Sequence, residues 1–136
     1  MNVAFITLLV DFGLVVLIWM IQLLVYPSFL HYTKSNLMKW HTSYTPRITA
    51  VVAPLMLAQI TLATFALWQE INALSIVYTV LICSTWIITF HTFIPIHKKI
   101  QEGNFSQATL TNLVKLNWYR TAIWTAIFVL SYFLVY

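Results

Sequence analysis

The chain has 136 residues, of which 61% are hydrophobic and only 7% are charged. A soluble domain carries about 25% charged residues, so this composition excludes an ordinary soluble protein. Two glycines and one cysteine also exclude a collagen-like or disulfide-stapled chain. We therefore expect an all-α integral membrane protein, whose length allows roughly four spans of about 20 residues each.

The first apolar run predicts a membrane helix over residues 3–30. It has no basic start and is too long for a cleavable signal peptide, so we expect it to remain as the first helix. Polar residues at 31–45 predict the first loop. Thr45 followed by Pro46 predicts the start of the second helix, over residues 46–68, because threonine caps helices and proline fits the first turn. Pro54 lies inside this helix and should kink it.

The third helix is expected over residues 73–96, with Asn72 as its cap and a continuation towards Glu102. Gly103 is a helix-stop signal. Ser106 is then expected to cap an amphipathic segment that leads into the fourth apolar helix, residues 116–136. No domain boundary or internal repeat is visible. The sequence therefore predicts a single four-helix bundle over residues 1–136.

The basic residues indicate how the helices are oriented. They flank the first and third loops, whereas the second loop and both termini contain no lysine or arginine. The positive-inside rule then places the first and third loops in the cytoplasm and both termini on the non-cytoplasmic side. We expect a multi-pass protein of the bacterial inner (cytoplasmic) membrane with lipids as partners. The net charge of +4 contains no basic run, so no nucleic-acid partner is predicted.

Several polar side chains lie near the expected cytoplasmic ends of the helices. His41 and His97 belong to the second and third helices, and His91 lies six residues before His97, about 9 Å deeper in the membrane at 1.5 Å per residue. Asn117 and Arg120 are three residues apart and share one helix face. Polar groups at membrane depth usually turn inward and find partners. The pattern predicts a polar pocket at the cytoplasmic mouth of the bundle, with these five residues as catalytic candidates.

Such a pocket suits a flat, oxygenated, lipophilic molecule that enters from the bilayer. Arg120 and Asn117 would hold a carbonyl or enolate oxygen, a histidine would carry a proton, and aromatic rings would stack on the ligand. The candidates for substrate binding are Trp118, Trp124, Tyr44 and Gln59.

These residues also have structural interpretations. Histidines beside lysines often contact lipid headgroups, and Arg120 can extend to phosphates at the interface. Asp11, an acid inside the membrane, is a functional candidate or a hydrogen-bond partner of a neighbouring helix.

Several kinds of site are excluded by composition. A carboxylate-bridged di-iron site needs about four glutamates, and zinc-type spacing and glycine-rich phosphate loops are absent. The pocket therefore requires no cofactor and no metal. Two neutral histidines on facing helices can ligate haem iron, so haem b is the alternative cofactor.

Two motifs resemble a known family. Pro95-x-His97 is followed, after a short loop, by Asn117-Trp118-x-Arg120-Thr121. This pattern resembles the second half of the anthrone-oxygenase-like membrane proteins, whose third helix ends in Pro-x-Asn and whose fourth begins with Asn-x-x-Arg-Thr. His97 stands where asparagine is usual. The resemblance implies a four-helix membrane fold and cofactor-independent oxygenation of an anthrone-like polyketide to a quinone.

Three functions follow as hypotheses. The first is a membrane enzyme, oxygenase- or oxidoreductase-like, acting on a lipophilic quinone- or phenol-like substrate. The second is a haem-binding electron-transfer protein. The third is a non-catalytic subunit of a larger membrane complex or a homo-oligomer.

Overall fold

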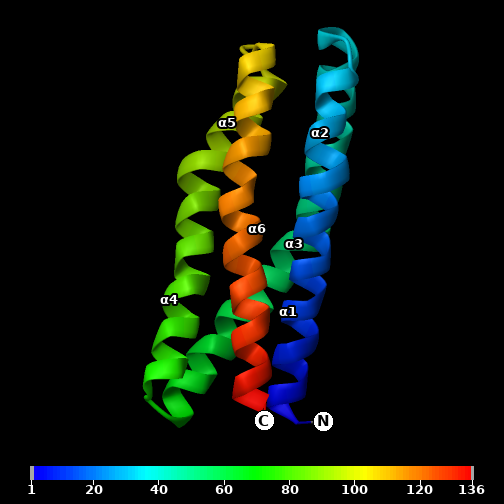
Figure 1. The fold of residues 1–136 in the computed structure, drawn as a ribbon. Helices are drawn as coiled ribbons and strands as arrows, with labels where there is room; N and C mark the ends of the chain where they lie inside the picture. Colours follow the sequence, from blue (N-terminus) through cyan, green and yellow to red (C-terminus); the bar gives the residue numbers. More distant parts are fainter. Residues whose placement is uncertain (1, 136) are drawn as a thin grey trace.

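The computed structural model describes residues 2–135 and is all-α (Figure 1). Its elements form four consecutive helical rods. The first rod joins α1 (Val3–Met20), the π-helical segment η1 (Ile21–Val25), α2 (Tyr26–Ser28) and the 3₁₀ turn η2 (Phe29–His31). The second is α3 (Lys34–Gln69), and the fourth is α6 (Gln107–Val135). The third joins α4 (Ala73–Ile88), the π-helical segment η3 (Thr89–Phe93) and α5 (Ile94–Gln101).

The rods form an up-and-down bundle. Figure 1 shows both ends of the chain at one end of the bundle, with the turn before α3 and the loop between α5 and α6 at the other. α6 lies between α1 and α4, and α3 crosses behind them. Three rods are long and apolar enough to cross a membrane, namely Val3–His31, Lys34–Gln69 and Ala73–Gln101.

The second helix begins earlier than predicted. α3 starts at Lys34, with the Thr33 hydroxyl accepting a hydrogen bond from the Asn36 amide at 3.3 Å, so the predicted loop at 31–45 and the start at Pro46 are wrong. Pro46 lies inside the helix, where it removes one backbone donor. The Thr45 hydroxyl donates to the His41 carbonyl at 2.9 Å and supplies a hydrogen bond on the same turn.

The third helix follows the predicted signals. Asn72 and Ser75 form a capping box, in which the Ser75 amide donates to Asn72 Oδ1 at 2.9 Å. The rod continues to Gln101 and stops before Gly103, whose φ of 76° lies in the left-handed region that favours glycine. α6 begins at Gln107, directly after Ser106 and nine residues before the predicted start of the fourth apolar helix. The predicted end of that helix at Tyr136 lies outside the described residues.

Each π-helical segment lies just before a proline. A single residue separates η1 from Pro27, and a single residue separates η3 from Pro95. A proline in a helix lacks an N–H and its ring collides with the carbonyl four residues earlier, and a wider π turn is one way to accommodate this. The two wide turns set the direction of the residues beside the prolines, including Tyr26 and His97.

One buried hydrogen-bond network joins all four rods. Asp11 on α1 is 1% exposed. Its carboxylate accepts hydrogen bonds from Gln59 Nε2 on α3 and from the Tyr78 hydroxyl on α4, both at 2.6 Å. The Trp124 indole on α6 donates to Gln59 Oε1 at 3.3 Å. Asp11 is therefore a hydrogen-bond partner of the neighbouring helices.

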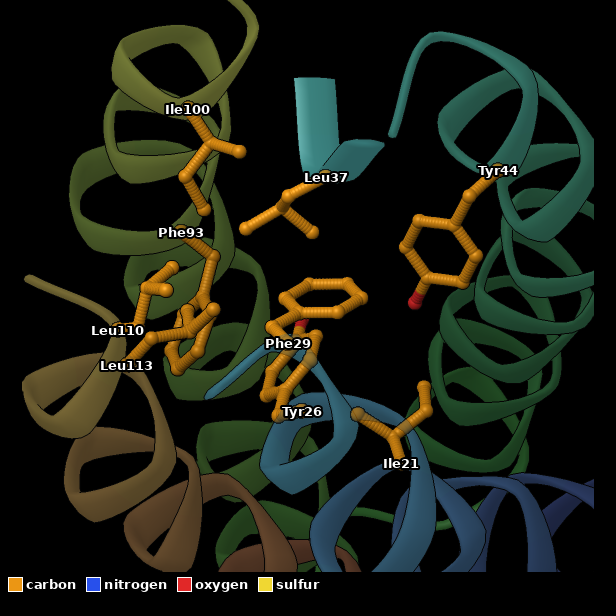
Figure 2. Close-up of a cluster of buried hydrophobic side chains, with 9 residues drawn as sticks. All are labelled: Ile21, Tyr26, Phe29, Leu37, Tyr44, Phe93, Ile100, Leu110 and Leu113. Carbon is orange, nitrogen blue, oxygen red and sulfur yellow. The ribbon is translucent and has the colours of Figure 1, made fainter. Parts of the chain in front are cut away.

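The apolar core has two parts. One surrounds this network and contains Leu14, Ile18, Met56, Ala63, Tyr78, Ile82, Trp124 and Ile127. The other lies towards the end of the bundle that holds the turn before α3 and the α5–α6 loop, which we call the loop end. It contains Ile21, Tyr26, Phe29, Leu37, Tyr44, Phe93, Ile100, Leu110 and Leu113 (Figure 2). In Figure 2, Phe29 lies at the centre and Tyr44 points its hydroxyl inward from α3. This second cluster holds the candidate site.

Candidate functional site

A pair of histidines from different rods lies at the loop end of the bundle. His41 Nε2 on α3 and His97 Nδ1 on α5 are 2.8 Å apart and share a hydrogen bond. Their rings stack with centroids 5.0 Å apart and an angle of 24° between the planes. His41 is fully buried. The sequence predicted both residues as site members, and the fold brings them into direct contact.

The pair belongs to a longer hydrogen-bonded chain. The Tyr26 hydroxyl lies 2.9 Å from His97 Nε2, and the Thr45 hydroxyl lies 3.3 Å from His41 Nδ1. The chain therefore runs from Tyr26 through His97 and His41 to Thr45, and it joins the first three rods. Each imidazole nitrogen in it has a partner.

A cavity of about 410 Å³ lies beside this chain, between α3 and the α4–α5 rod. Tyr26, His97 and Thr45 lie on its wall, and most of the rest of the lining is apolar. Exposed residues of both rods, Thr49 and Phe90 among them, also line it, so the cavity opens on the side of the bundle. Further lining residues are Ile48, Val52, Met56, Trp86, Thr89, Ile94 and Tyr44.

Arg120 supplies a cation to the same wall. It is 5% exposed, and its guanidinium carbon lies 4.2 Å from the centre of the Phe93 ring and 4.9 Å from that of Trp124. This placement between two aromatic faces stabilises the cation. The Arg120 Nε has no hydrogen-bond partner among the described residues. Within residues 2–135 the salt bridge joins Lys98 to Glu102 and does not involve Arg120. Arg120 is thus a buried cation with no acidic partner among these residues.

Trp86 and Thr89 also line the cavity. The indole nitrogen of Trp86 and the hydroxyl of Thr89 are themselves buried and have no hydrogen-bond partner within residues 2–135. Buried polar atoms are nearly always hydrogen-bonded, so these two atoms are exceptions beside the cavity.

Other predicted site residues lie elsewhere. His91 is exposed on the outer side of η3, with Nδ1 3.1 Å from the Ile87 carbonyl oxygen. Trp118 is 47% exposed and packs edge-on against Trp19. Neither residue lines the cavity, because the π turn of η3 and the angular position of Trp118 on α6 direct them outward.

Asn117 and Gln59 are buried but serve the packing between helices. Asn117 Nδ2 donates to Gln22 Oε1 at 2.9 Å, and Thr121 donates to the same oxygen at 3.1 Å. Gln59 belongs to the Asp11 network. The predicted partnership of Asn117 and Arg120 on one oxygen is therefore absent, because Gln22 in η1 takes the amide of Asn117.

Four residues beside the cavity were not predicted from the sequence, namely Tyr26, Thr45, Trp86 and Thr89. Tyr26 and Thr45 each directly precede a proline, which is the signal that could have found them. Tyr44 and Trp124, by contrast, were predicted. Tyr44 lines the cavity, and the Trp124 ring packs against the Arg120 guanidinium.

His41 and His97 are not spaced as the two axial ligands of one haem iron. Two axial nitrogens on one iron would lie about 4 Å apart, twice a metal–imidazole distance of about 2 Å, whereas His41 Nε2 and His97 Nδ1 are 2.8 Å apart. The remaining nitrogens face Tyr26 and Thr45. Among the described residues, no group of three or more His, Cys, Asp or Glu side chains is placed to hold a metal ion.

No protein-family model, curated protein or solved structure matches this chain. The cavity and its side chains therefore carry the functional assignment.

Proposed function

We propose that this protein binds a lipophilic, oxygenated ring compound of the phenol or quinone class in the cavity and exchanges a proton with it. The observation that carries the proposal is Arg120, a buried cation on the cavity wall that lacks an acidic partner among the described residues. A buried charge is costly unless it is paired, and an oxygen with developing negative charge is the partner that the cavity can receive.

The rest of the wall supports this class of ligand. Aliphatic and aromatic side chains such as Val52, Met56 and Phe90 dominate the lining, which favours an apolar ring. Arg120 and the Tyr26 hydroxyl supply polar groups at one part of this lining. The combination suits a ligand with one or two oxygen atoms on an apolar frame.

The neighbouring side chains support proton exchange. Tyr26 lies on the wall and contacts both His97, at 2.9 Å, and the Arg120 side chain. A phenol hydroxyl bonded to an imidazole is a general acid–base pair, and Arg120 would stabilise the oxygen that gains negative charge. The resemblance to anthrone-oxygenase-like proteins extends this proposal to oxygenation of such a ring without a cofactor.

We place the protein in the bacterial cytoplasmic membrane as a multi-pass protein. In this proposal α6 is a fourth span, since it packs between α1 and α4 (Figure 1). The basic residues beside the first and third loops orient those loops to the cytoplasm. The cavity then lies towards the cytoplasmic half of the bilayer, and its lateral opening between α3 and α4 admits a ligand from the lipid phase.

The test is the binding of 2-naphthol to the protein in lipid nanodiscs, measured by naphthol fluorescence. We expect Arg120→Gln to weaken binding by at least about tenfold, because a hydrogen bond to a charged group contributes roughly 1.5–3 kcal/mol. The matched control is Lys115→Gln, which removes an exposed cation from the same helix outside the cavity. Equal affinity in wild type and Arg120→Gln would contradict the proposal.

A further inference from the structure

The direction of each hydrogen bond in the Tyr26–His97–His41–Thr45 chain can be worked out from its last member. A threonine hydroxyl has one hydrogen to donate. The Thr45 hydroxyl donates it to the His41 carbonyl oxygen at 2.9 Å. We assign the hydrogen to the carbonyl because that contact is the shorter one, so in the contact with His41 Nδ1 at 3.3 Å Nδ1–H donates to the Thr45 oxygen.

This first step fixes the rest of the chain. A neutral imidazole carries one N–H, and burial without an acidic partner favours the neutral form. With its hydrogen on Nδ1, His41 accepts at Nε2 from His97 Nδ1–H, and His97 then accepts at Nε2 from the Tyr26 hydroxyl. All the hydrogen bonds therefore point from Tyr26 towards Thr45.

Both ends of this chain lie on the same cavity. Tyr26 and Thr45 line it, whereas the fully buried His41 does not. A proton that enters at Tyr26 can therefore leave at Thr45 into the same cavity. We propose that the chain is a two-ended proton relay that interconverts the enol and keto forms of a bound lipophilic ketone, an activity that rests on the proposed binding function.

The step balances without an oxidant. The enol O–H, beside Arg120, gives its proton to the Tyr26 oxygen, and the O–H bonding pair becomes the π pair of the new carbonyl. The Tyr26 proton moves to His97 Nε2, the His97 Nδ1 proton to His41 Nε2, and the His41 Nδ1 proton to Thr45. The Thr45 hydroxyl turns from the His41 carbonyl and gives its proton to the ligand carbon, where the C=C π pair forms the new C–H bond.

The relay suits a site in the membrane because it leaves no charge behind. Each member of the relay loses one proton as it gains another, so no imidazolium ion has to persist at a fully buried position, where it would be costly. After one turnover every hydrogen bond points the other way, and the reverse reaction restores the starting direction. The relay therefore catalyses exchange in both directions.

The experiment measures deuterium uptake from D₂O at the α-carbons of 2-tetralone, by mass spectrometry, with the protein in lipid nanodiscs. Thr45→Val removes the outlet hydroxyl at nearly constant shape, and Thr61→Val makes the same change on α3 at an exposed position outside the cavity. We expect Thr45→Val to lower the exchange rate about 100-fold, within the range of general acid–base effects. The dissociation constant of Thr45→Val for 2-tetralone should stay within about twofold of wild type, because Thr45 lies away from the end that binds the ligand oxygen. Thr61→Val should change neither the exchange rate nor the dissociation constant.

The outcomes separate the relay from the binding proposal. Wild-type protein that binds 2-tetralone but exchanges its protons no faster than protein-free nanodiscs would overturn the relay and leave the binding function standing. Full exchange in Thr45→Val, with helical content equal to wild type, would overturn Thr45 as the second end. Failure of the wild type to bind both 2-tetralone and 2-naphthol would overturn both proposals.

Discussion

Replacing Tyr78 by phenylalanine tests the buried network that joins the four rods. Tyr78 is fully buried and donates to Asp11 Oδ2 at 2.6 Å, and Asp11 itself is 1% exposed. Removing the hydroxyl takes one short hydrogen bond away from a buried carboxylate. Hydrogen bonds to charged groups contribute about 1.5–3 kcal/mol, whereas side-chain hydrogen bonds between membrane helices average only about 0.6 kcal/mol. Because the acceptor is a buried carboxylate with short bonds, we expect a loss near 1.5–2 kcal/mol in the free energy of unfolding.

The measurement is reversible unfolding in mixed micelles by titration with sodium dodecyl sulfate, followed by circular dichroism. Tyr119→Phe is the matched control, because Tyr119 is 68% exposed and should change stability by less than about 0.5 kcal/mol. A double-mutant cycle with Asp11→Asn isolates the energy of the Tyr78–Asp11 pair. If Tyr78→Phe is as stable as Tyr119→Phe, Asp11 does not hold the helices together in the way inferred here.

Three further predictions concern other parts of the chain. His91→Ala should leave 2-naphthol binding unchanged because His91 faces outward, whereas His97→Ala should weaken binding several-fold because His97 lines the cavity. The measurement is the same fluorescence titration, and equal losses of affinity in the two variants would show that both histidines line the site. Gly103→Ala should destabilise the protein by about 1 kcal/mol in the unfolding titration, since φ is 76° and a Cβ would lie 3.1 Å from Met38 Cε; unchanged stability would show that this turn relaxes freely. The absorption spectrum of the purified protein, before and after dithionite, should contain only tryptophan and tyrosine bands, because His41 is already hydrogen-bonded to His97; a Soret band that shifts on reduction would favour haem binding instead.

The sequence by itself determined the rods and where several of them end. Long apolar runs must form helices in lipid, because every backbone polar group has to be satisfied within the segment. Asn72 caps its helix and Gly103 stops another through short-range geometry that needs no tertiary contact. The sequence also placed His41, His97 and Arg120 near one end of the bundle, because polar side chains in apolar helices turn towards one another. In the structure the two histidines are in contact, and His97 and Arg120 line one cavity.

Only the tertiary structure decided which polar groups meet. Proline favours the first turn of a helix, and only the structure shows that Pro46 lies inside α3. The π turns at η1 and η3 change the angular phase of the residues within and after them, so regular helical spacing misplaced His91 and missed Tyr26. Asn117 lies on the regular helix α6, and its amide is taken by Gln22 from another rod. The cavity and the placement of Arg120 away from acidic partners within residues 2–135 depend on distances between rods, which local sequence does not encode.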